Sequence, residues 1–513
     1  MARVVQRTLI DDTHLSVLLQ PRTDVVTERR LDGVDSEAGR FGPADGPFDH
    51  YLRTVVVHGT DPDGRHDTEE VTDFHLAVPI WGLLFVGLFK RAVRRRGVHG
   101  EAAAGPRFWE PPDRLDVRAA TVLGLLCSVA LVAGYLGTVL TQTVTFAAEQ
   151  FGDDQTAQSA TLAAVRVGVL GSLVLVALAD RWGRRRLLLG TAVAGCLATS
   201  LGAVAPNLIA LGLTQAVSRG FATAVVVLLT VVAAEEMPAG ARAYAVSVMT
   251  LTGALGAGMA VWLLPVADLG PGAWRMLYVL PLVYLPLLAY VGKRLPESRR
   301  FEASHVEAPV AGHGGRLRLL AATFFLTSVF SQPASQLQNE FLRHDRGFSA
   351  TTISLFILVT STPGFLGIVI GGRLADTRGR RVVASVAVSV GALATVASFL
   401  SHGWLLWAWA AVGVLFGAAA VPSLGVYGPE LFPTSLRGRA NGVIQLVAVA
   451  GSSLGLLAAG VMAGHIGLGR AMAVLVIAPL LVGALVLVAL PETAHLELEV
   501  LNPEDRSPEG SVA

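Results

Sequence analysis

The sequence predicts an all-α membrane protein of twelve transmembrane helices, arranged as two six-helix repeats, with a small N-terminal cytoplasmic appendage. Three observations predict this fold class. Of the 513 residues, 52% are hydrophobic and only 15% are charged, which is too apolar for a soluble protein of this length. Apolar runs of about 20 residues, the length that crosses a bilayer, occur twelve times. Short charged motifs recur at a constant offset, which indicates an internal duplication.

The apolar runs form two groups of six, rich in glycine and alanine, as is usual where helices pack closely in lipid. We expect spans near 119–143, 157–179, 187–205, 207–233, 243–265 and 273–292, then 317–339, 350–373, 382–400, 404–426, 440–463 and 468–490. The predicted regions are an acidic N-terminal region (1–73), an apolar interfacial segment with a basic linker (74–117), a first bundle (118–300), a cytoplasmic linker (301–316), a second bundle (317–493) and a polar tail (494–513).

Three short motifs with charged residues occur once in each half, in the same order and between predicted spans. The pairs are Ala-Asp-Arg-Trp-Gly-Arg-Arg (179–185) with Ala-Asp-Thr-Arg-Gly-Arg-Arg (375–381), Glu-x-x-Pro-x-x-x-Arg (235–242) with its copy (430–437), and Pro-Glu-Ser (296–298) with Pro-Glu-Thr (491–493). The offset is 196 residues for the first pair and 195 for the other two. A duplicated membrane bundle of this kind is typical of a transporter.

Basic residues indicate how the bundle is oriented. If the motif-bearing loops face the cytoplasm, the inner side between Lys90 and Arg439 carries 25 basic residues and the opposite side carries four. We therefore expect a multi-pass protein of the plasma membrane, with both termini in the cytoplasm. We expect a monomer in the lipid bilayer that binds a small molecule and no nucleic acid. Cys127 and Cys196 lie in apolar runs without metal-ligand spacing, so neither a metal nor a cofactor is expected.

The first 73 residues hold fifteen acidic and eight basic residues. Residues 51–58 and 69–76 have the pattern of two strands joined by a turn at 59–64, which favours a small strand-containing appendage; disorder is the alternative. The apolar segment 74–89 is short for a span and is followed at once by a basic cluster. It predicts a helix in the cytoplasmic interface, with the cluster on anionic headgroups. A thirteenth span stays open as the alternative.

The first two motifs lie at the cytoplasmic ends of predicted spans and predict a gate. An aspartate beside arginines at a helix end can accept hydrogen bonds from a neighbouring helix N-terminus or pair with an arginine. In the second motif a proline turns the chain, so that the glutamate and the arginine can face each other. A topological anchor and a local salt bridge are the alternatives. The candidate gate residues are Asp180, Arg184, Glu235, Arg242, Asp376, Arg380, Glu430 and Arg437.

Two arginines, Arg166 and Arg219, lie inside predicted spans, whereas no acidic residue lies mid-span. A guanidinium in hydrocarbon costs at least about 2.5–3.5 kcal/mol unless it faces a wet cavity or a partner. Both arginines are therefore candidates for binding an anionic substrate. Arg219 could instead cap backbone carbonyls or pair with Glu149 or Glu340, and proton coupling is a third interpretation.

The seventh predicted span carries a polar stripe that includes Gln332, Gln336 and Asn339 on one helical face. Pro333 can interrupt this helix and free carbonyl groups to line a cavity. These three side chains are the best candidates for the cavity after the arginines, and Tyr135 and Gln142 on the first span are weaker ones. Hydrogen bonding between helices is the alternative.

The loop motifs resemble the signature of the major facilitator superfamily, Gly-x-Leu-Ala-Asp-Arg-x-Gly-Arg-Arg. The copy at 372–381 fits closely, and the first copy has Val176 in place of the leading glycine. The block 429–438 and the two Pro-Glu motifs are similar to the sugar porter and metabolite:proton symporter branches. The resemblance covers about residues 118–500. It implies two halves that rock about a central site, a cytoplasmic charge network at Asp180, Arg184, Asp376 and Arg380, and a broken seventh helix that contacts the ligand.

The resemblance implies a secondary transporter rather than an enzyme, but two departures affect the coupling. The first span lacks the acidic residue that is usual in sugar:proton symporters, which leaves Glu149 and Glu340 as candidate protonation sites. The fifth span lacks the Gly-Pro stretch that is usual in drug:proton antiporters. No nucleotide-binding loop of the G-x-x-x-x-G-K-[ST] type occurs. We therefore expect alternating-access transport of a small polar metabolite, with an anion as the favoured class. Export of drug-like compounds and a transporter-fold sensor are the alternatives.

Overall fold

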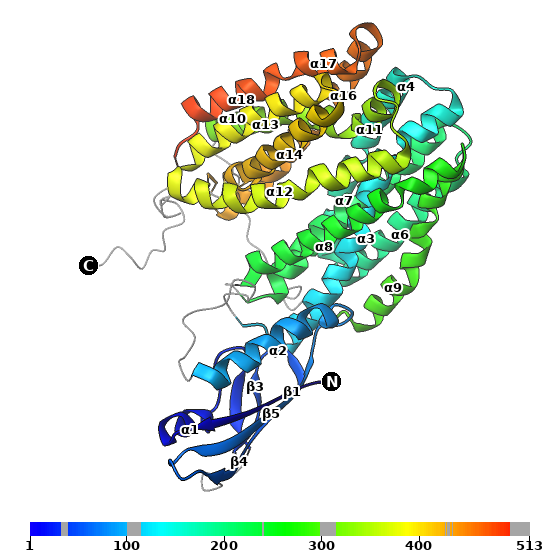
Figure 1. Ribbon diagram of the computed structural model, residues 1–513. Coiled ribbons are helices and arrows are strands. Elements are labelled where there is room, and N and C mark those ends of the chain that lie inside the picture. The colour runs from blue at the N-terminus through cyan, green and yellow to red at the C-terminus, as the bar shows by residue number, and fades with distance from the viewer. Residues whose placement is uncertain are drawn as a thin grey trace.

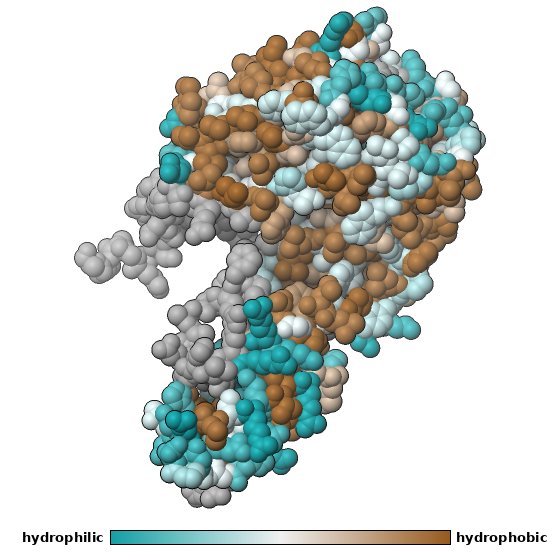
Figure 2. Space-filling model, viewed as in Figure 1, coloured by the Kyte–Doolittle hydropathy of each residue, from teal (hydrophilic) through white to brown (hydrophobic). Residues whose placement is uncertain are grey.

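The computed structural model describes residues 1–31, 39–99, 114–238, 241–297, 314–425, 427, 431–432 and 434–492. The predicted tail (494–513) and most of the predicted linker lie outside these ranges. A small sheet domain at the N-terminus is followed by a large helical bundle (Figure 1). The surface of the bundle is rich in hydrophobic residues, whereas that of the sheet domain is largely hydrophilic (Figure 2).

The sheet domain contains one antiparallel sheet of five strands in the order β1-β5-β4-β3-β2. The strands are β1 (Ala2–Ile10), β2 (Thr27–Arg30), β3 (Gly39–Asp45), β4 (Phe48–Thr60) and β5 (His66–Leu76), with α1 (Asp12–Leu18) after β1. The hairpin predicted from the sequence is present as β4 and β5, in which Tyr51 lies opposite Phe74. Buried and more exposed residues alternate along both strands, as the period of two requires when one face is covered.

The helix α2 (Gly82–His99) covers that face of the sheet. Phe85, Phe89, Ala92 and Val93 pack with Phe48 and other sheet residues in one hydrophobic cluster. The prediction of a continuous interfacial helix over 74–89 is therefore wrong in its boundaries. Residues 74–76 complete β5, an irregular segment follows, and the helix begins only at Gly82. The physical reason is that the alternation of β5 continues to Leu76, whose side chain is buried under α2.

A buried ionic cluster lies inside the sheet domain. The Arg53 guanidinium, 1% exposed, donates to Glu28 Oε2 at 2.8 Å and to Glu70 Oε1 at 3.2 Å. The Tyr51 hydroxyl donates to Glu28 Oε1 at 2.6 Å. Burial, and then the Glu28 carboxylate, raise the pKa of Tyr51 well above its usual value, so the phenol stays a donor. Because every charge here has a partner, the cluster fixes the positions of β2, β4 and β5 relative to one another.

The bundle has two halves. The first contains α3 (Val117–Phe151), α4 (Gln155–Val167), α5 (Val169–Trp182), α6 (Arg184–Ser200), α7 (Leu208–Glu236), α8 (Arg242–Trp262) and α9 (Leu280–Arg294), with short helices η1 (Leu201–Val204), η3 (Leu264–Leu269) and η4 (Ala273–Tyr278). The second contains α10 (Gly314–Gln336), α11 (Gln338–Glu340), η5 (Phe341–Asp345), α12 (Ala350–Arg378), α13 (Arg380–Leu400), α14 (Gly403–Gly425), α16 (Thr434–Ile466), α17 (Leu468–Leu475) and α18 (Ile477–Ala489).

Eleven helical stretches in the described residues are long and apolar enough to cross a membrane. The predicted seventh span corresponds to α10, which is not among the eleven because its arginines and glutamines lower its hydropathy. The predicted second span is divided at Gly168 into α4 and α5. A Cβ at Gly168 would lie 1.9 Å from the carbonyl oxygen of Ala216, so only glycine permits this approach of α7.

The two halves are splayed toward the side where the sheet domain lies and meet at the opposite end (Figure 1). At that end α4 packs against α16, η3 against α12, and α3 against α11. The loop motifs lie at the splayed end, because α5 and α12 finish there and α6 and α13 begin there. With the orientation predicted from the basic residues, the halves are closed on the outer side.

We predict that Arg53→Met unfolds the sheet domain locally in the full-length protein. Removal of one partner leaves Glu28 and Glu70 buried without their cation, which costs about 3–5 kcal/mol. Limited proteolysis in detergent should show faster cleavage within residues 1–99. Arg7→Gln is the matched control, since its ion pair with Asp67 is exposed and should contribute little. Equal cleavage rates for the two variants would contradict a stabilising role of the cluster.

Candidate functional site

Arg219 and Arg166 reach the same cavity between the two halves of the bundle. The cavity has a volume of about 20 Å³ and is lined from α3, α4, α7 and α10, and none of its described lining residues is acidic. Arg219 Nη1 donates to the carbonyl oxygen of Gly137 at 2.6 Å, while its Nε is buried without a hydrogen-bond partner. The Nε–H group of Arg219 is therefore left without an acceptor, beside a cavity whose described lining includes no carboxylate to neutralise the guanidinium.

Arg166 extends from α4 across to the second half, where Nη2 donates to the side-chain oxygen of Gln332 on α10. Three of the residues predicted for the cavity, Arg166, Arg219 and Gln332, thus lie together. A cavity of this size has room for about one water molecule. A larger ligand requires the helices around Arg166 and Arg219 to separate.

Two further contacts join α3 to the end of α10 and to α11. Thr141 donates to Gln336 Oε1 at 2.6 Å, and the Asn339 side chain donates to the carbonyl and to Oε1 of Gln142, both at 3.0 Å. Thr141 and Gln336 are 195 residues apart, which is the offset of the repeat. They occupy equivalent positions in the two halves, so the pseudo-twofold axis passes between them. The polar stripe predicted for the cavity is thus also the seam between the halves.

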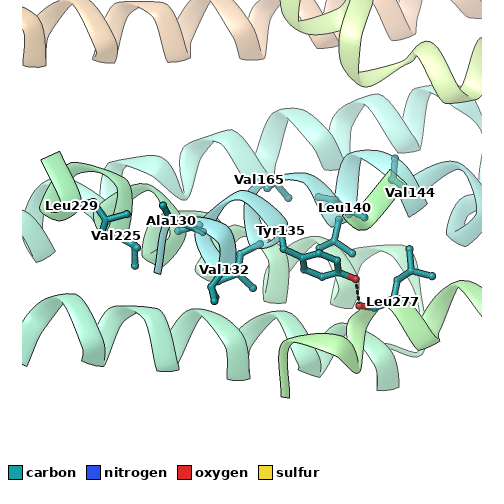
Figure 3. Packing of buried hydrophobic residues seen from close by; sticks show 14 of the residues in the cluster. Ala130, Val132, Tyr135, Leu140, Val144, Val165, Val225, Leu229 and Leu277 are labelled. Atoms are coloured by element: carbon teal, nitrogen blue, oxygen red, sulfur yellow. Dashed lines mark hydrogen bonds between the residues drawn. The ribbon is translucent and has the colours of Figure 1, made fainter. Parts of the chain in front are cut away.

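Tyr135 is not brought into this group. Its side chain is fully buried in the interior of the first half, and its hydroxyl donates to the carbonyl oxygen of Leu277 at 2.6 Å (Figure 3). Its ring packs edge-on against Tyr284. Tyr135 and Gln142 are seven residues, or about two turns, apart on α3 and so lie on nearly the same face of the helix. Only Gln142, however, contacts the second half. The structure places Tyr135 in the packing of α3 against η4 and α9.

The outer ends of the halves are joined by charged groups. Arg343 Nε donates to Glu149 Oε2 at 3.2 Å, and the Asp268 carboxylate accepts from the backbone N–H groups of Ala350 and Thr351, both at 2.9 Å. Glu340 is buried and lies 3.7 Å from His344. Both candidate protonation sites therefore lie at this end of the bundle, and Glu149 takes part in joining the halves. The sequence analysis missed Asp268, because nothing local reveals that it caps a helix of the other half.

At the splayed end, the third repeated motif meets the first. The Glu297 carboxylate accepts from the backbone N–H of Arg185 at 3.0 Å. In the second half, Glu492 accepts from the backbone N–H groups of Arg380 and Arg381 at 2.9 and 3.1 Å. Each carboxylate satisfies the free N–H groups at the start of a helix, α6 or α13, where a negative charge is favoured. The sequence signal was present, because each Pro-Glu motif repeats together with the loop it contacts.

The predicted gate residues are only partly described. Arg184 Nε lies 2.8 Å from Glu235 Oε1, and this ion pair lies within the first half. Arg118 pairs nearby with Glu236 at 3.0 Å and donates to the carbonyl oxygen of Glu297 at 3.2 Å. Glu430 lies outside the described residues, as do the side chains of Asp180, Arg242, Asp376 and Arg437. Their participation in a gate stays a prediction.

We predict that Glu297→Gln loosens the start of α6 in the intact protein. Loss of a capping side chain costs about 0.5–2 kcal/mol, and an amide also lacks the charge that the helix N-terminus favours. Cys196 is buried in α6, so a thiol-reactive dye should label it faster on mild heating. Glu69→Gln, the same change on the open face of the sheet, is the control. A labelling rate equal to that of the control would argue against the cap.

Two family patterns match the chain, one in each half. The pattern described as "Sugar (and other) transporter" matches residues 119–309, and the pattern described as "Major Facilitator Superfamily" matches residues 319–508. A probable 4-methylmuconolactone transporter of Cupriavidus pinatubonensis is 27% identical over 247 residues. That match covers 45% of this chain and 57% of the relative, so it spans little more than half the length of that protein.

Solved structures share the fold. The xylose transporter XylE from E. coli, in an inward open conformation, has a TM-score of 0.63 and 16% identity, covering 75% of this chain and 99% of that chain. A bacterial homolog of the human lysosomal transporter Spinster, inward-facing and unoccupied, has a TM-score of 0.61 and 14% identity, covering 76% and 99%. The two matched halves, the repeated loop motifs and this shared fold lead to one conclusion: the chain is a multi-pass membrane protein that belongs to the major facilitator superfamily.

Proposed function

We propose that the protein is a secondary transporter of a small organic anion and works by alternating access. The observation that carries this proposal is the Arg219 guanidinium: among the described residues its buried Nε has no hydrogen-bond partner, and the described lining of the cavity beside it contains no acidic residue. An unsatisfied buried donor costs about 1–3 kcal/mol. A carboxylate would supply the missing acceptor and could bind two parallel N–H groups of arginine.

The other polar groups around Arg219 fit a substrate that carries oxygen atoms besides its carboxylate. Arg166, Gln336 and Gln215 line the same cavity, and amide groups can donate to a carbonyl or hydroxyl group. The substrate named for the Cupriavidus relative supports this class, because a muconolactone carries a carboxylate and a lactone ring. Xylose, named for one structural neighbour, has no charge, and the paired arginines favour the anion over a neutral sugar.

The two ends of the bundle suggest how access alternates. The outer end is joined across the halves by Glu149 with Arg343 and by Asp268 with the start of α12. The loop residues Asp180, Arg184, Asp376 and Arg380, with the Glu–Arg pairs that begin at Glu235 and Glu430, would form the opposite gate when the halves close on the cytoplasmic side. Breaking one set of contacts as the other forms keeps the two states similar in free energy.

The coupling and the surroundings follow from the same residues. The first span has no acidic residue, so a coupled proton would be carried at Glu149 or Glu340. We place the protein in the plasma membrane, with both termini cytoplasmic, on the distribution of its basic residues.

Export of drug-like compounds is less well supported, because two arginines in the cavity would disfavour a hydrophobic or cationic ligand. A sensor of this fold would bind an anion without moving it, and flux into proteoliposomes distinguishes the two.

We predict that Arg219→Ala lowers the affinity for small carboxylates at least about tenfold, which is the loss of one charge-assisted hydrogen bond, without loss of the folded protein. Arg219→Lys should restore the affinity only in part, since an ammonium does not match the planar carboxylate. Binding is measured by thermal shift in detergent with carboxylic acids, including muconolactone, and with their methyl esters. The variant should also lose the preference for acid over ester.

Arg470→Ala is the matched control, because this arginine is exposed at the outer side. An unchanged affinity for carboxylates in Arg219→Ala would sink the anion hypothesis and leave the arginine as a cap for Gly137. Binding without flux in the unmodified protein would instead favour a sensor.

We predict that Asp376→Asn shifts the population toward the inward-open state, because the cytoplasmic closure loses a charge. Labelling of single cysteines at the two ends of the bundle should increase on the cytoplasmic side and decrease on the outer side. Asp345→Asn, at the end of η5 and at the opposite end of the bundle, is the control, and we expect no shift toward the inward-open state. An unaltered labelling pattern in Asp376→Asn would leave this residue with an anchoring role only.

A further inference from the structure

We propose that residues 77–89 form a hairpin that enters the inner leaflet and reaches toward the middle of the bilayer. This hairpin anchors the sheet domain among the acyl chains. The occupant of its exposed leucine face is lipid. This inference concerns a part of the molecule remote from the arginine cavity and does not depend on what is transported.

The first limb of the hairpin climbs along α3. The carbonyl oxygen of Ala77 accepts from Thr121 Oγ1 at 3.0 Å, Pro79 lies against Gly124, and the Trp81 indole N–H donates to Ser128 Oγ at 3.0 Å. The partners on α3 advance in step with the residues of the segment. The chain therefore runs parallel to α3 and away from its cytoplasmic end.

The depth of Trp81 can be measured along α3. Arg118, near the start of that helix, belongs to the charged cluster with Glu236 and Glu297 that marks the cytoplasmic boundary. Ser128 lies ten residues further, or about 15 Å at the rise of an α-helix. The hydrocarbon core is about 30 Å thick, so Trp81 reaches toward the middle of the bilayer.

The second limb, α2, returns to the cytoplasmic side. The carbonyl oxygen of Val93 accepts from Arg22 Nη1 at 3.4 Å, and the neighbouring carbonyls of Thr23 and Asp24 accept from Arg114, which precedes α3. Val93 therefore lies near the level of Arg114, whereas Trp81 lies at the level of Ser128. Ser128 lies eleven residues, or about 17 Å, beyond Val117, where α3 begins, and α2 covers a similar length between Gly82 and Val93. The limbs thus run in opposite directions.

Irregular backbone at membrane depth requires internal hydrogen bonds or cover by protein, and the turn of the hairpin meets that requirement. The N–H groups of Trp81, Gly82 and Leu84 donate to the carbonyls of Pro79, Val78 and Trp81 at 2.7, 3.0 and 3.0 Å. Val78 and Trp81 also pack against the hydrophobic core of the first half. The turn thus closes without leaving these donors to lipid.

The outer face of α2 matches the bilayer. Leu83, Leu84 and Leu88 are 87%, 68% and 38% exposed and lie on the side opposite to the residues that pack on the sheet. Nine residues after Gly82, about 13 Å lower, Arg91 is exposed, at the level where phosphate headgroups begin. A leucine face followed by basic residues is the pattern of a segment that passes from acyl chains to anionic headgroups.

Nitroxide labels on single cysteines in the full-length protein test the hairpin in vesicles that contain phosphatidylglycerol. Cys127 and Cys196 are first replaced by alanine, and labels are placed through Leu83→Cys, Leu88→Cys and Arg91→Cys. We expect collision with oxygen to decrease, and collision with a water-soluble nickel chelate to increase, in that order. Leu9→Cys, on the open face of the sheet, is the control in water.

Two results would overturn the proposal. If the label at Leu83 meets the nickel chelate as often as the label at Leu9, the leucine face lies in water. If it is shielded from both oxygen and nickel, another protein surface covers it instead of lipid. A membrane depth that decreases from Leu83 to Arg91 supports the hairpin. None of these variants changes Arg166 or Arg219, so the test is independent of the proposed substrate site.

Discussion

The whole molecule depends on one constraint: a polar group at membrane depth needs a partner inside the protein, because hydrocarbon offers none. Along the first span and its surroundings the constraint is met repeatedly. Thr141, Gln142 and Gln215 bond to protein groups, and the Trp81 indole finds Ser128. The Nε of Arg219 is an exception. This atom belongs to an ionised side chain that also lines the cavity, and that combination is the physical reason to look for a ligand there.

The duplication explains why the same arrangement appears at both repeated loops. Glu297 and Glu492 each cap the helix that follows a glycine with positive φ, Gly183 or Gly379, where a Cβ would lie 3.0 Å or less from the carboxylate. A side chain at either glycine would displace the cap. The two halves thus share their loop chemistry, whereas the arginines of the cavity come from the first half alone; the position equivalent to Arg219 is Val414. The ligand site that we propose and the loops that the halves share thus lie in different parts of the chain.

Much of this organisation could be predicted from the sequence. Span length, the repeat and the basic residues depend on local hydropathy and charge, which are additive along the chain, so the bundle and the β4–β5 hairpin could be predicted. The sequence could predict that Gln332 and Asn339 belong to a polar stripe. It could not predict that they pair with Arg166 and Gln142, because these partners lie on other helices. Tyr135 and Asp268 mark the limit. Which way a tyrosine faces on a helix buried on all sides, and which helix start an aspartate caps, are decided by tertiary packing.

The attachment of the sheet domain has a mechanical consequence. Arg114, Thr121 and Ser128 tie it to the first half of the bundle, so in the alternating-access mechanism that we propose the domain would turn as one body with that half. Points far from a pivot travel furthest for a given rotation. The strand ends of the sheet, which project well beyond the helices (Figure 1), would then act as a lever arm that converts a small tilt of the bundle into a larger displacement outside it.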